Sequence, residues 1–188
     1  MKLTVTENTP RALRFKLEGV SIGFANAVRR VAINSIECFA IDSVTFYENS
    51  SAIFDEYIAH RIGLVPITTP NGYTKEDQIL FKLEAEGPCT VYSKDLESND
   101  KEVKVANEKI PIIKLASGQK LRLDGKAALG TASRSSKFQP GLVTYKMPEE
   151  GVFEFQVESF GQMSSNEIIA KTLSIITNDV KEVRKKLE

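Results

Sequence analysis

The 188-residue chain contains no tryptophan, one histidine and only two cysteines, Cys38 and Cys89, which stand far apart in the sequence. It has no C-x-x-C motif and no cluster of histidine and cysteine, so a zinc or iron–sulfur site would lack its ligands. We therefore expect no metal and no cofactor. Both cysteines are expected to be reduced thiols that pack as small hydrophobic side chains.

Long apolar runs are also absent, and none approaches the roughly 18 residues of a membrane-spanning helix. The stretch from Met1 to Glu7 alternates between polar and apolar residues and lacks the apolar segment of a signal peptide. These features predict a soluble, cytoplasmic protein. The composition, with 41% hydrophobic and 27% charged residues, excludes a disordered or collagen-like chain. The length suits one domain or two small interleaved domains.

The overall charge balance hides two opposed segments. The 25 basic and 25 acidic side chains cancel, yet residues 42–102 carry 5 basic and 12 acidic groups, a net charge of −7. Residues 109–146 carry 8 basic groups and Asp124 alone, a net charge of +7. The two segments could face each other or face different partners. The alternative function is a free-standing nucleic-acid binding module that uses residues 109–146, although only Phe138 and Tyr145 are present there to stack on bases.

Helical periodicity appears at both ends of the chain. From about Gly23 to Ile36, apolar and small residues recur at helical spacing and form one stripe. A shorter helix is predicted from Phe54 to Gly63, and the residues placed on its apolar side are Phe54, Tyr57, Ile58 and Ile62.

A third helix is predicted to begin at Ser164, which with Glu167 fits a capping box, and to run to the end of the chain. Its apolar residues are spaced alternately four and three apart, as in a heptad seam: Ile169, Leu173, Ile176, Val180, Val183 and Leu187. Such a narrow seam suits another helix better than a broad sheet. It packs either on its own domain or on a partner helix, and the pattern favours a partner because this domain offers only one other long helix.

Strand signals occupy the remainder of the chain. Alternating residues predict a hairpin over residues 3–17 with a turn at residues 8–10, and a later strand that begins at Val152. From about Thr68 to Lys146 only strands and loops are expected. The other strand candidates are Ile41–Tyr47, Ile79–Leu83, Thr90–Tyr92, Val103–Val105, Ile110–Leu115 and Leu121–Leu123.

His60 is the only candidate for histidine acid–base chemistry. It lies on the short predicted helix with Asp55 and Glu56, either of which could pair with it. The sequence contains no nucleophile elbow, phosphate-binding loop or dinucleotide-binding motif. We therefore expect no catalytic residues in this chain, and we interpret His60 as structural or interfacial.

Two stretches of the sequence resemble a known family. The first is Phe24-Ala25-Asn26-Ala27-Val28-Arg29-Arg30-Val31, followed by Ala40-Ile41-Asp42, and the second is Ala59-His60-Arg61-Ile62-Gly63-Leu64-Val65-Pro66. Both are similar to signatures of the assembly-platform subunits of cellular RNA polymerases. The second points to the archaeal and eukaryotic branch, and within it to the archaeal D-type subunits, rather than to the bacterial alpha subunit. Shorter matches at residues 90–96, 110–115, 118–121, 138–140 and 153–159 extend the resemblance over nearly the whole chain.

The resemblance implies an α+β fold. A discontinuous α/β dimerisation domain, residues 1–46 and 150–188, would carry an inserted β-rich domain, residues 47–149. Many archaeal relatives insert a cysteine-bearing, ferredoxin-like module before the last strand. Here the interval from Pro140 to Phe153 is short and contains no cysteine, so neither that module nor an iron–sulfur cluster is expected.

The resemblance also implies a function: a non-catalytic assembly subunit of DNA-directed RNA polymerase, the nucleotidyltransferase of transcription. The implied partners are the small L subunit, the large catalytic subunits (chiefly the second largest) and small assembly subunits, with no membrane and at most indirect contact with DNA. The residues implied for the interface with the L subunit, as a heterodimer, are Phe24, Val28, Val31, Ile169, Leu173, Ile176, Val180, Val183 and Leu187. Those implied for large-subunit docking are Asn26, Arg29, Arg30, Asp55, Glu56, His60 and Arg61.

Overall fold

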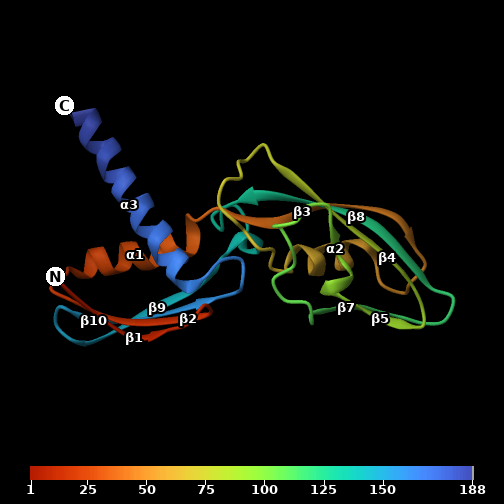
Figure 1. Ribbon diagram of the computed structural model, residues 1–188, viewed down its shortest axis with the longest axis horizontal. Coiled ribbons are helices and arrows are strands. Elements are labelled where there is room, and N and C mark those ends of the chain that lie inside the picture. The colour runs from red at the N-terminus through yellow and green to blue at the C-terminus, as the bar shows by residue number, and fades with distance from the viewer. Residues whose placement is uncertain (188) are drawn as a thin grey trace. The chain divides into compact units, whose positions relative to one another are not determined.

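The structure, a computed structural model, describes residues 1–187 and divides into two compact units (Figure 1). Unit 1 is built from both ends of the chain, Met1–Glu37 and Thr131–Glu188, and unit 2 is the continuous segment Cys38–Gly130. Both units combine helices with antiparallel sheets. The predicted α+β fold class is confirmed.

The unit boundaries differ from the expected division at residues 46/47 and 149/150. Strand β3 (Cys38–Asn49) pairs along its length with β8 (Lys120–Gly130), so all of β3 belongs to unit 2. Strand β9 (Gly141–Glu149) pairs with β10 (Val152–Ser159), which places β9 in unit 1. Strand pairing, which the sequence does not display, sets both boundaries.

The sheet of unit 1 has the order β1-β2-β10-β9, with β1 at Lys2–Asn8 and β2 at Ala12–Glu18. Helix α1 (Ile22–Asn34) packs on β9 and α3, and α3 (Ser165–Leu187) packs on β10 and β2, so one face of the sheet is covered by helices (Figure 1). The rings of Phe15 and Phe155 stack in the core at a centroid distance of 4.9 Å. The alternation of β2 and β10 therefore buries one face, as the sequence predicted.

Small residues let α1 lie close to this core. Ala25 and Ala32 are fully buried, and Val28 lies between them on the same stripe. Ser21 caps the helix, since its Oγ accepts a hydrogen bond from the Phe24 N–H at 3.2 Å. The expected helix from Gly23 to Ile36 is thus present, with its ends shifted by one or two residues.

The first turn of α3 is attached to the β1–β2 turn. Ser165 donates two hydrogen bonds, from its Oγ to the Thr9 carbonyl at 2.7 Å and from its N–H to the Pro10 carbonyl at 2.9 Å. Ser164 and Glu167 form the predicted capping box: the Ser164 N–H and Oγ donate to Glu167 Oε2 at 2.9 and 2.8 Å. These bonds fix where α3 begins and how it is rotated.

Helix α3 has two apolar stripes, of which one is buried within unit 1 and the other is largely exposed. Ser165, Ile168 and Thr172 are buried against the sheet of unit 1, and Ile175 continues their line half-buried. The predicted seam occupies a different side and is left half-buried or exposed. From Thr177 to Leu187 every residue of the helix is exposed, and this half extends beyond the sheet (Figure 1).

Unit 2 contains a four-stranded antiparallel sheet in the order β3-β8-β4-β6, with β4 at Gln78–Glu86 and β6 at Glu97–Ser98. A two-stranded ribbon pairs β5 (Cys89–Tyr92) with β7 (Pro111–Leu115), and helix α2 (Asp55–Gly63) packs on β3 and β7. The core between these elements includes Phe39, Phe81, Ile58 and Ile62, all fully buried. Short 3-10 turns lie at Ser93–Asp95 and, in unit 1, at Ser136–Phe138.

The acidic and basic segments meet on the sheet of unit 2. Arg122 of β8 lies between Glu48 of β3 and Glu84 of β4 in the strand register, and Lys120 Nζ lies 3.5 Å from Glu86 Oε2. Opposite charges on neighbouring strands stabilise a sheet modestly and cancel each other's field. On this sheet, therefore, the −7 and +7 segments of the sequence face each other.

Several expected elements differ from the structure. Residues 103–105 form no strand, and only Val105 makes a single bridge, to Ile67. Strand β9 was not predicted, because Leu142 adds an apolar residue to its outer face and the residues from Lys146 to Glu149 give no apolar alternation. Cys38 is buried as expected, whereas Cys89 is exposed at the start of the β5–β7 ribbon, so its expected packing role is wrong. No helix within residues 1–187 is long and apolar enough to span a membrane.

Replacing Ser164 with alanine should lower the free energy of unfolding by about 1 kcal/mol, because the Glu167 carboxylate and the helix N–H lose their capping partner. Urea denaturation of the purified chain measures the change. Ser174→Ala is the matched control, since the Ser174 hydroxyl only donates back to the Ala170 carbonyl and its loss should be nearly neutral. Equal losses for both variants would contradict the cap.

The Ser164 N–H and hydroxyl hold the pKa of Glu167 below its usual value. The stabilisation by Glu167 is therefore fully present above the ordinary glutamate pKa and is lost as the pH falls through the lowered pKa of the folded chain. The difference in unfolding free energy between the parent and Glu167→Gln should shrink on acidification. A difference that grows toward low pH would contradict this assignment.

The two stripes of α3 should respond differently to truncation. Ile168→Ala should cost about 2–5 kcal/mol in unfolding free energy, because it opens a cavity against the sheet. Val183→Ala should change that free energy by less than about 0.5 kcal/mol, because Val183 touches no core. A comparable cost for Val183, measured by urea denaturation of the isolated chain, would show that the seam packs on its own unit.

Candidate functional site

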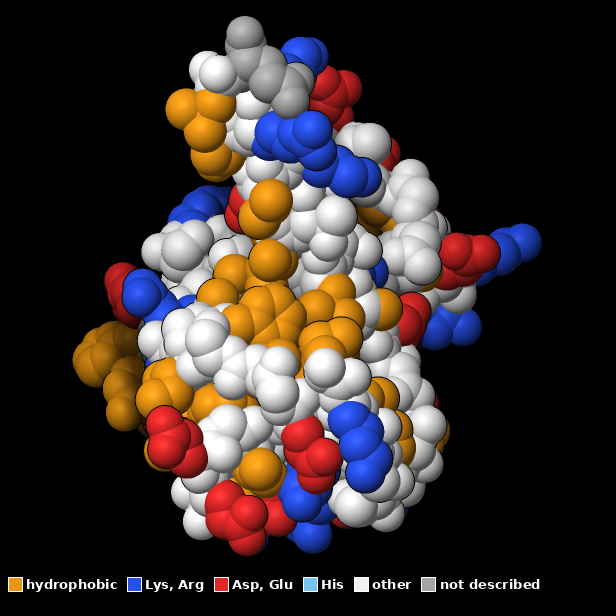
Figure 2. Space-filling view, turned by 90° about the vertical axis from the view of Figure 1, so that its left-hand side faces the viewer, with side chains coloured by type: hydrophobic (Ala, Val, Ile, Leu, Met, Phe, Trp, Pro, Cys, Tyr) orange, Lys and Arg blue, Asp and Glu red, His pale blue; other side chains and the backbone are white. Residues whose placement is uncertain are grey.

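Unit 1 leaves a large amount of apolar surface exposed. Figure 2 shows a face on which hydrophobic side chains gather at the centre, with more of them along the protruding helix α3. The large hydrophobic side chains of unit 1 that are more than two-fifths exposed are Met1, Leu3, Val5, Ile22, Leu142, Met147, Phe160, Leu173, Val180, Val183 and Leu187. Exposed apolar surface of this kind is typical of binding surfaces.

The expected interface residues of α3 lie on one outward-facing side of the helix. Leu173 is 43% exposed, Val180 62%, Val183 59% and Leu187 83%, while Ile169 and Ile176 are half-buried. Their spacing forms a single apolar line that the unit does not cover. We call these six residues the α3 seam.

The expected interface residues of α1 separate into two groups. Phe24 and Val31 are half-buried and keep some surface. Val28 is only 3% exposed and belongs to the core of unit 1, so its assignment to a partner surface is corrected. The helical stripe read from the sequence did not distinguish the side that meets the sheet from its neighbour.

Sequence reasoning missed the apolar contribution of β1 and the start of α1. Leu3 and Val5 alternate like the buried residues of β2, yet they are 57% and 47% exposed, because β1 is the edge strand and both helices pack elsewhere. Ile22, at the start of α1, is 58% exposed. Only the position of β1 in the sheet reveals that these side chains are available.

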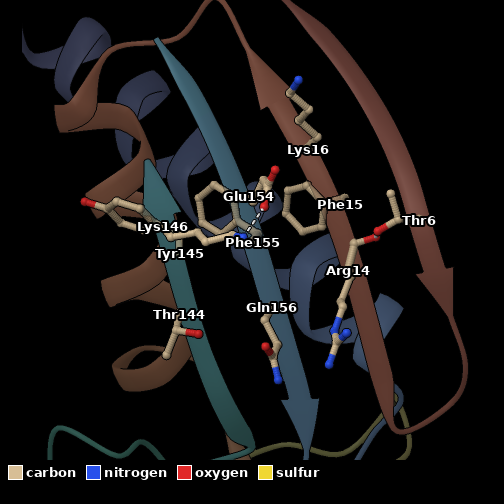
Figure 3. Close-up of a pocket in the computed structure, with 10 residues that line it drawn as sticks. All are labelled: Thr6, Arg14, Phe15, Lys16, Thr144, Tyr145, Lys146, Glu154, Phe155 and Gln156. Carbon is tan, nitrogen blue, oxygen red and sulfur yellow. Dashed lines mark hydrogen bonds and ion pairs between the residues drawn. The ribbon is translucent and has the colours of Figure 1, made fainter. Parts of the chain in front are cut away.

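The face of this sheet opposite the helices is polar and slightly hollowed, with a volume of about 510 Å³ (Figure 3). Arg14, Lys16 and Lys146 line it, and each has a carboxylate partner: Glu7 at 3.2 Å, Glu18 at 2.9 Å and Glu154 at 2.8 Å, respectively. The hydrogen bond between Lys16 and Glu18 raises the pKa of Lys16 and lowers the pKa of Glu18. The hollow therefore offers no concentration of positive charge to an anion.

The expected docking residues of α1 form a small cluster. The Arg29 guanidinium donates to Asn26 Oδ1 from Nη2 at 2.9 Å and from Nε at 3.3 Å, so Asn26 holds Arg29 half-buried against its own helix. Arg30, the next residue, is exposed. Arg30 is the side chain of this group whose charge is most accessible to a partner.

The expected docking residues of α2 are all exposed in unit 2: Asp55, Glu56, His60 and Arg61. Asp55 Oδ1 accepts a hydrogen bond from Asn49 Nδ2 at 2.7 Å, and Arg61 Nη2 donates to the Pro111 carbonyl. These two side chains thus also fasten α2 to its own unit. The α1 and α2 groups lie in different units.

An exposed apolar group beside Asp55 was not predicted as surface. Ile53, Phe54 and Tyr57 are 43%, 79% and 68% exposed. The sequence placed Phe54 and Tyr57 on the buried side of the short helix with Ile58, and this is wrong. Phe54 has extended backbone and precedes the helix, so helical spacing does not carry it to the side of Ile58.

The basic segment 109–146 is divided between the two units. Residues 109–130 belong to unit 2 and residues 131–146 to unit 1. Lys120, Arg122 and Lys146 lie beside carboxylates, and the Arg122 guanidinium also sits over the Tyr47 ring at 5.5 Å. A surface with interleaved charges lacks the electrostatic footprint of a nucleic-acid binding groove.

Few of the described residues are candidates for a catalytic or metal-binding role. The His60 side chain is exposed and takes part in no hydrogen bond or ion pair within residues 1–187. In that same part of the chain, no three histidine, cysteine or acidic side chains are grouped so as to hold a metal ion. The expectation of a chain without cofactors stays a prediction.

Comparison with known proteins agrees on one family. The sequence model described as "RNA polymerase Rpb3/RpoA insert domain" matches residues 31–144. A protein of Methanocaldococcus jannaschii named "DNA-directed RNA polymerase subunit Rpo3" is 42% identical over 167 residues, which are 89% of this chain and 86% of the relative. Proteins of the same name from Thermococcus kodakarensis and Natronomonas pharaonis are 44% identical over 153 residues and 40% over 161 residues.

The relatives differ in length from this chain. The matched residues are 78% of this chain and 59% of the Thermococcus relative, and 81% of this chain and 65% of the Natronomonas relative. This chain therefore spans about three-fifths of the length of the first of these. Since the family model matches more than half of the chain and the Methanocaldococcus relative is 42% identical over most of both chains, the chain belongs to the RNA polymerase Rpb3/RpoA family.

Proposed function

We propose that this chain is the assembly-platform subunit of an archaeal DNA-directed RNA polymerase, of the D type, and that it acts in the cytoplasm without catalytic residues of its own. The observation that carries the proposal is the unused apolar seam of α3. Membership of the Rpb3/RpoA family and the names of the relatives support it.

The α3 seam is best explained by a second chain. The unit buries a different stripe of the same helix, so the exposed seam residues Leu173, Val180, Val183 and Leu187 are not needed for internal packing. Complete burial of an exposed leucine or valine stabilises a complex by about 1.5–3 kcal/mol, before the cost of association is subtracted. Leu173, Val180, Val183 and Leu187 together are sufficient to hold a partner helix with a matching apolar line.

We assign this surface to the small L subunit. Phe24 and Val31 of α1, which packs beside α3, would widen the seam into a two-helix surface. The exposed apolar side chains of β1 and Ile22 extend the apolar area of the unit further. A heterodimer formed here would bury surface that is costly to leave in water.

The surface around α2 is proposed to dock the large catalytic subunits, chiefly the second largest. Ile53, Phe54 and Tyr57 provide an apolar centre, and Glu56 and His60 provide part of a polar rim, which is the usual composition of a protein interface. Arg30 of unit 1 would add a charge-specific contact. Small assembly subunits would complete the set of partners, and contact with DNA would be indirect.

The seam can be tested by co-expression with an archaeal L subunit. The parent chain should form a 1:1 heterodimer in size-exclusion chromatography with light scattering. Val180→Asp with Val183→Asp should weaken binding at least tenfold, about 1.4 kcal/mol, because two carboxylates would be buried in the interface.

Lys181→Asp is the control for the seam variants. It places a carboxylate on the same turns of α3 but off the seam, and it should leave the heterodimer intact. A parent chain that stays monomeric with the L subunit present would refute the proposed partner. Equal weakening by the control would show that charge, not the seam, decides binding.

Arg30→Glu should leave the heterodimer with the L subunit intact and weaken capture of the second-largest subunit. Loss of one partner of a desolvated charge pair costs about 2–5 kcal/mol, so pull-down by the heterodimer should fall strongly. Lys16→Glu is the control, since Lys16 lies on the opposite face of the sheet from α1. Unchanged capture by Arg30→Glu would refute this role.

A further inference from the structure

Asn71 is the only one of the nine asparagines in the sequence that is followed by glycine. Both residues are exposed and occupy the turn between Pro70 and Tyr73. Gly72 has φ of +101°, which suits the third position of a type II turn and which residues with a side chain rarely adopt. No atom lies within 4 Å of the position that a Cβ on Gly72 would occupy. The space around this peptide bond is therefore open.

We propose that Asn71 is a site of spontaneous deamidation, at which the folded chain forms isoaspartate. Within residues 1–187 neither the Asn71 side chain nor the Gly72 N–H makes a hydrogen bond. The carboxamide and the backbone nitrogen that would attack it are thus both available. This proposal is independent of the polymerase assignment.

The chemistry requires only water and base. The Gly72 nitrogen loses its proton and forms a bond to Asn71 Cγ, while the bond between Cγ and Nδ2 breaks and ammonia leaves with the proton. The product is a five-membered succinimide. Water then adds to one of its two carbonyls, which yields aspartate when the ring opens on one side and isoaspartate when it opens on the other. Glycine favours the attack because it has no side chain to crowd the nitrogen.

Three other asparagines are restrained by comparison. Asn49, which precedes Ser50, donates from Nδ2 to the Ile53 carbonyl at 2.9 Å and to Asp55 Oδ1 at 2.7 Å. Asn99 Oδ1 accepts from the Leu80 N–H at 3.0 Å, and Asn107 Oδ1 accepts from the Lys109 N–H at 3.1 Å. A carboxamide held by such bonds cannot rotate freely toward the next nitrogen.

The turn also lies between two residues, Thr69 and Tyr73, that are both held by contacts with Phe39. Thr69 Oγ1 accepts a hydrogen bond from the Phe39 N–H at 2.9 Å, and the Tyr73 ring packs edge-on against the Phe39 ring at a centroid distance of 5.4 Å. Isoaspartate lengthens the backbone between these anchors by one carbon. It also adds a carboxylate near Tyr73, whose hydroxyl already donates to Asp100. The modification therefore changes both the shape and the charge of this end of unit 2.

The experiment incubates the purified full chain in neutral and mildly alkaline buffer and maps isoaspartate by peptide mass spectrometry and isoaspartyl methyltransferase labelling. Isoaspartate at Asn71 should form at least about tenfold faster than at Asn49, equivalent to about 1.4 kcal/mol in activation free energy. The rate at Asn71 should rise with hydroxide concentration. Asn71→Gln should abolish the dominant signal, while Asn49→Gln should leave it unchanged.

A denatured sample separates the effect of the local sequence on the deamidation rate from the effect of the folded structure. Unfolding in urea should accelerate deamidation at Asn49, because its hydrogen bonds are lost, and should change the rate at Asn71 little. The proposal is overturned if Asn71 reacts no faster than Asn49 in the folded chain. It is also overturned if unfolding accelerates Asn71 as much as Asn49, since the folded turn would then protect it.

Discussion

The rotation of α3 about its own axis is the constraint on which the rest of unit 1 depends. Ser165 sets that rotation through its two hydrogen bonds to the turn between β1 and β2. Successive residues of a helix are about 100° apart, so a fixed first turn decides which side chains of every later turn face the sheet. Ile168 and Thr172 face inward as a result, and the seam faces outward. A different rotation by one residue would bury part of the seam and expose part of the core.

Charged side chains on the sheets are paired within the chain, whereas part of the apolar surface is left exposed. On the sheet of unit 2, basic residues of β8 lie beside acidic residues of β3 and β4, and on the open face of unit 1 each lysine or arginine of the hollow meets a carboxylate. On these two surfaces, therefore, basic side chains are balanced by neighbouring carboxylates. The surfaces left unsatisfied are apolar, and this favours protein partners over nucleic acid.

The sequence predicted the features that depend on local pattern. The capping box of Ser164 and the heptad spacing of α3 are both present in the structure, as is the α+β class. Positions decided by distant contacts were missed. Val28 is core because the sheet lies beneath it, and Val5 is exposed because β1 is an edge. No periodicity in a single segment carries this information. Phe54 was missed for a local reason, since the helix begins one residue later than predicted.

The sheet of unit 1 joins β1 and β2, near the start of the chain, to β9 and β10, which begin at Gly141 and Val152. All strands of unit 2 lie between them in the chain. During synthesis the N-terminal residues emerge first and domains fold as units, so unit 2 can be complete while the β1–β2 hairpin still waits for its sheet partners. Ser165 can reach the hairpin turn only after β10 has emerged. A nascent chain therefore cannot present the finished α1–α3 surface until β10 and α3 have been made.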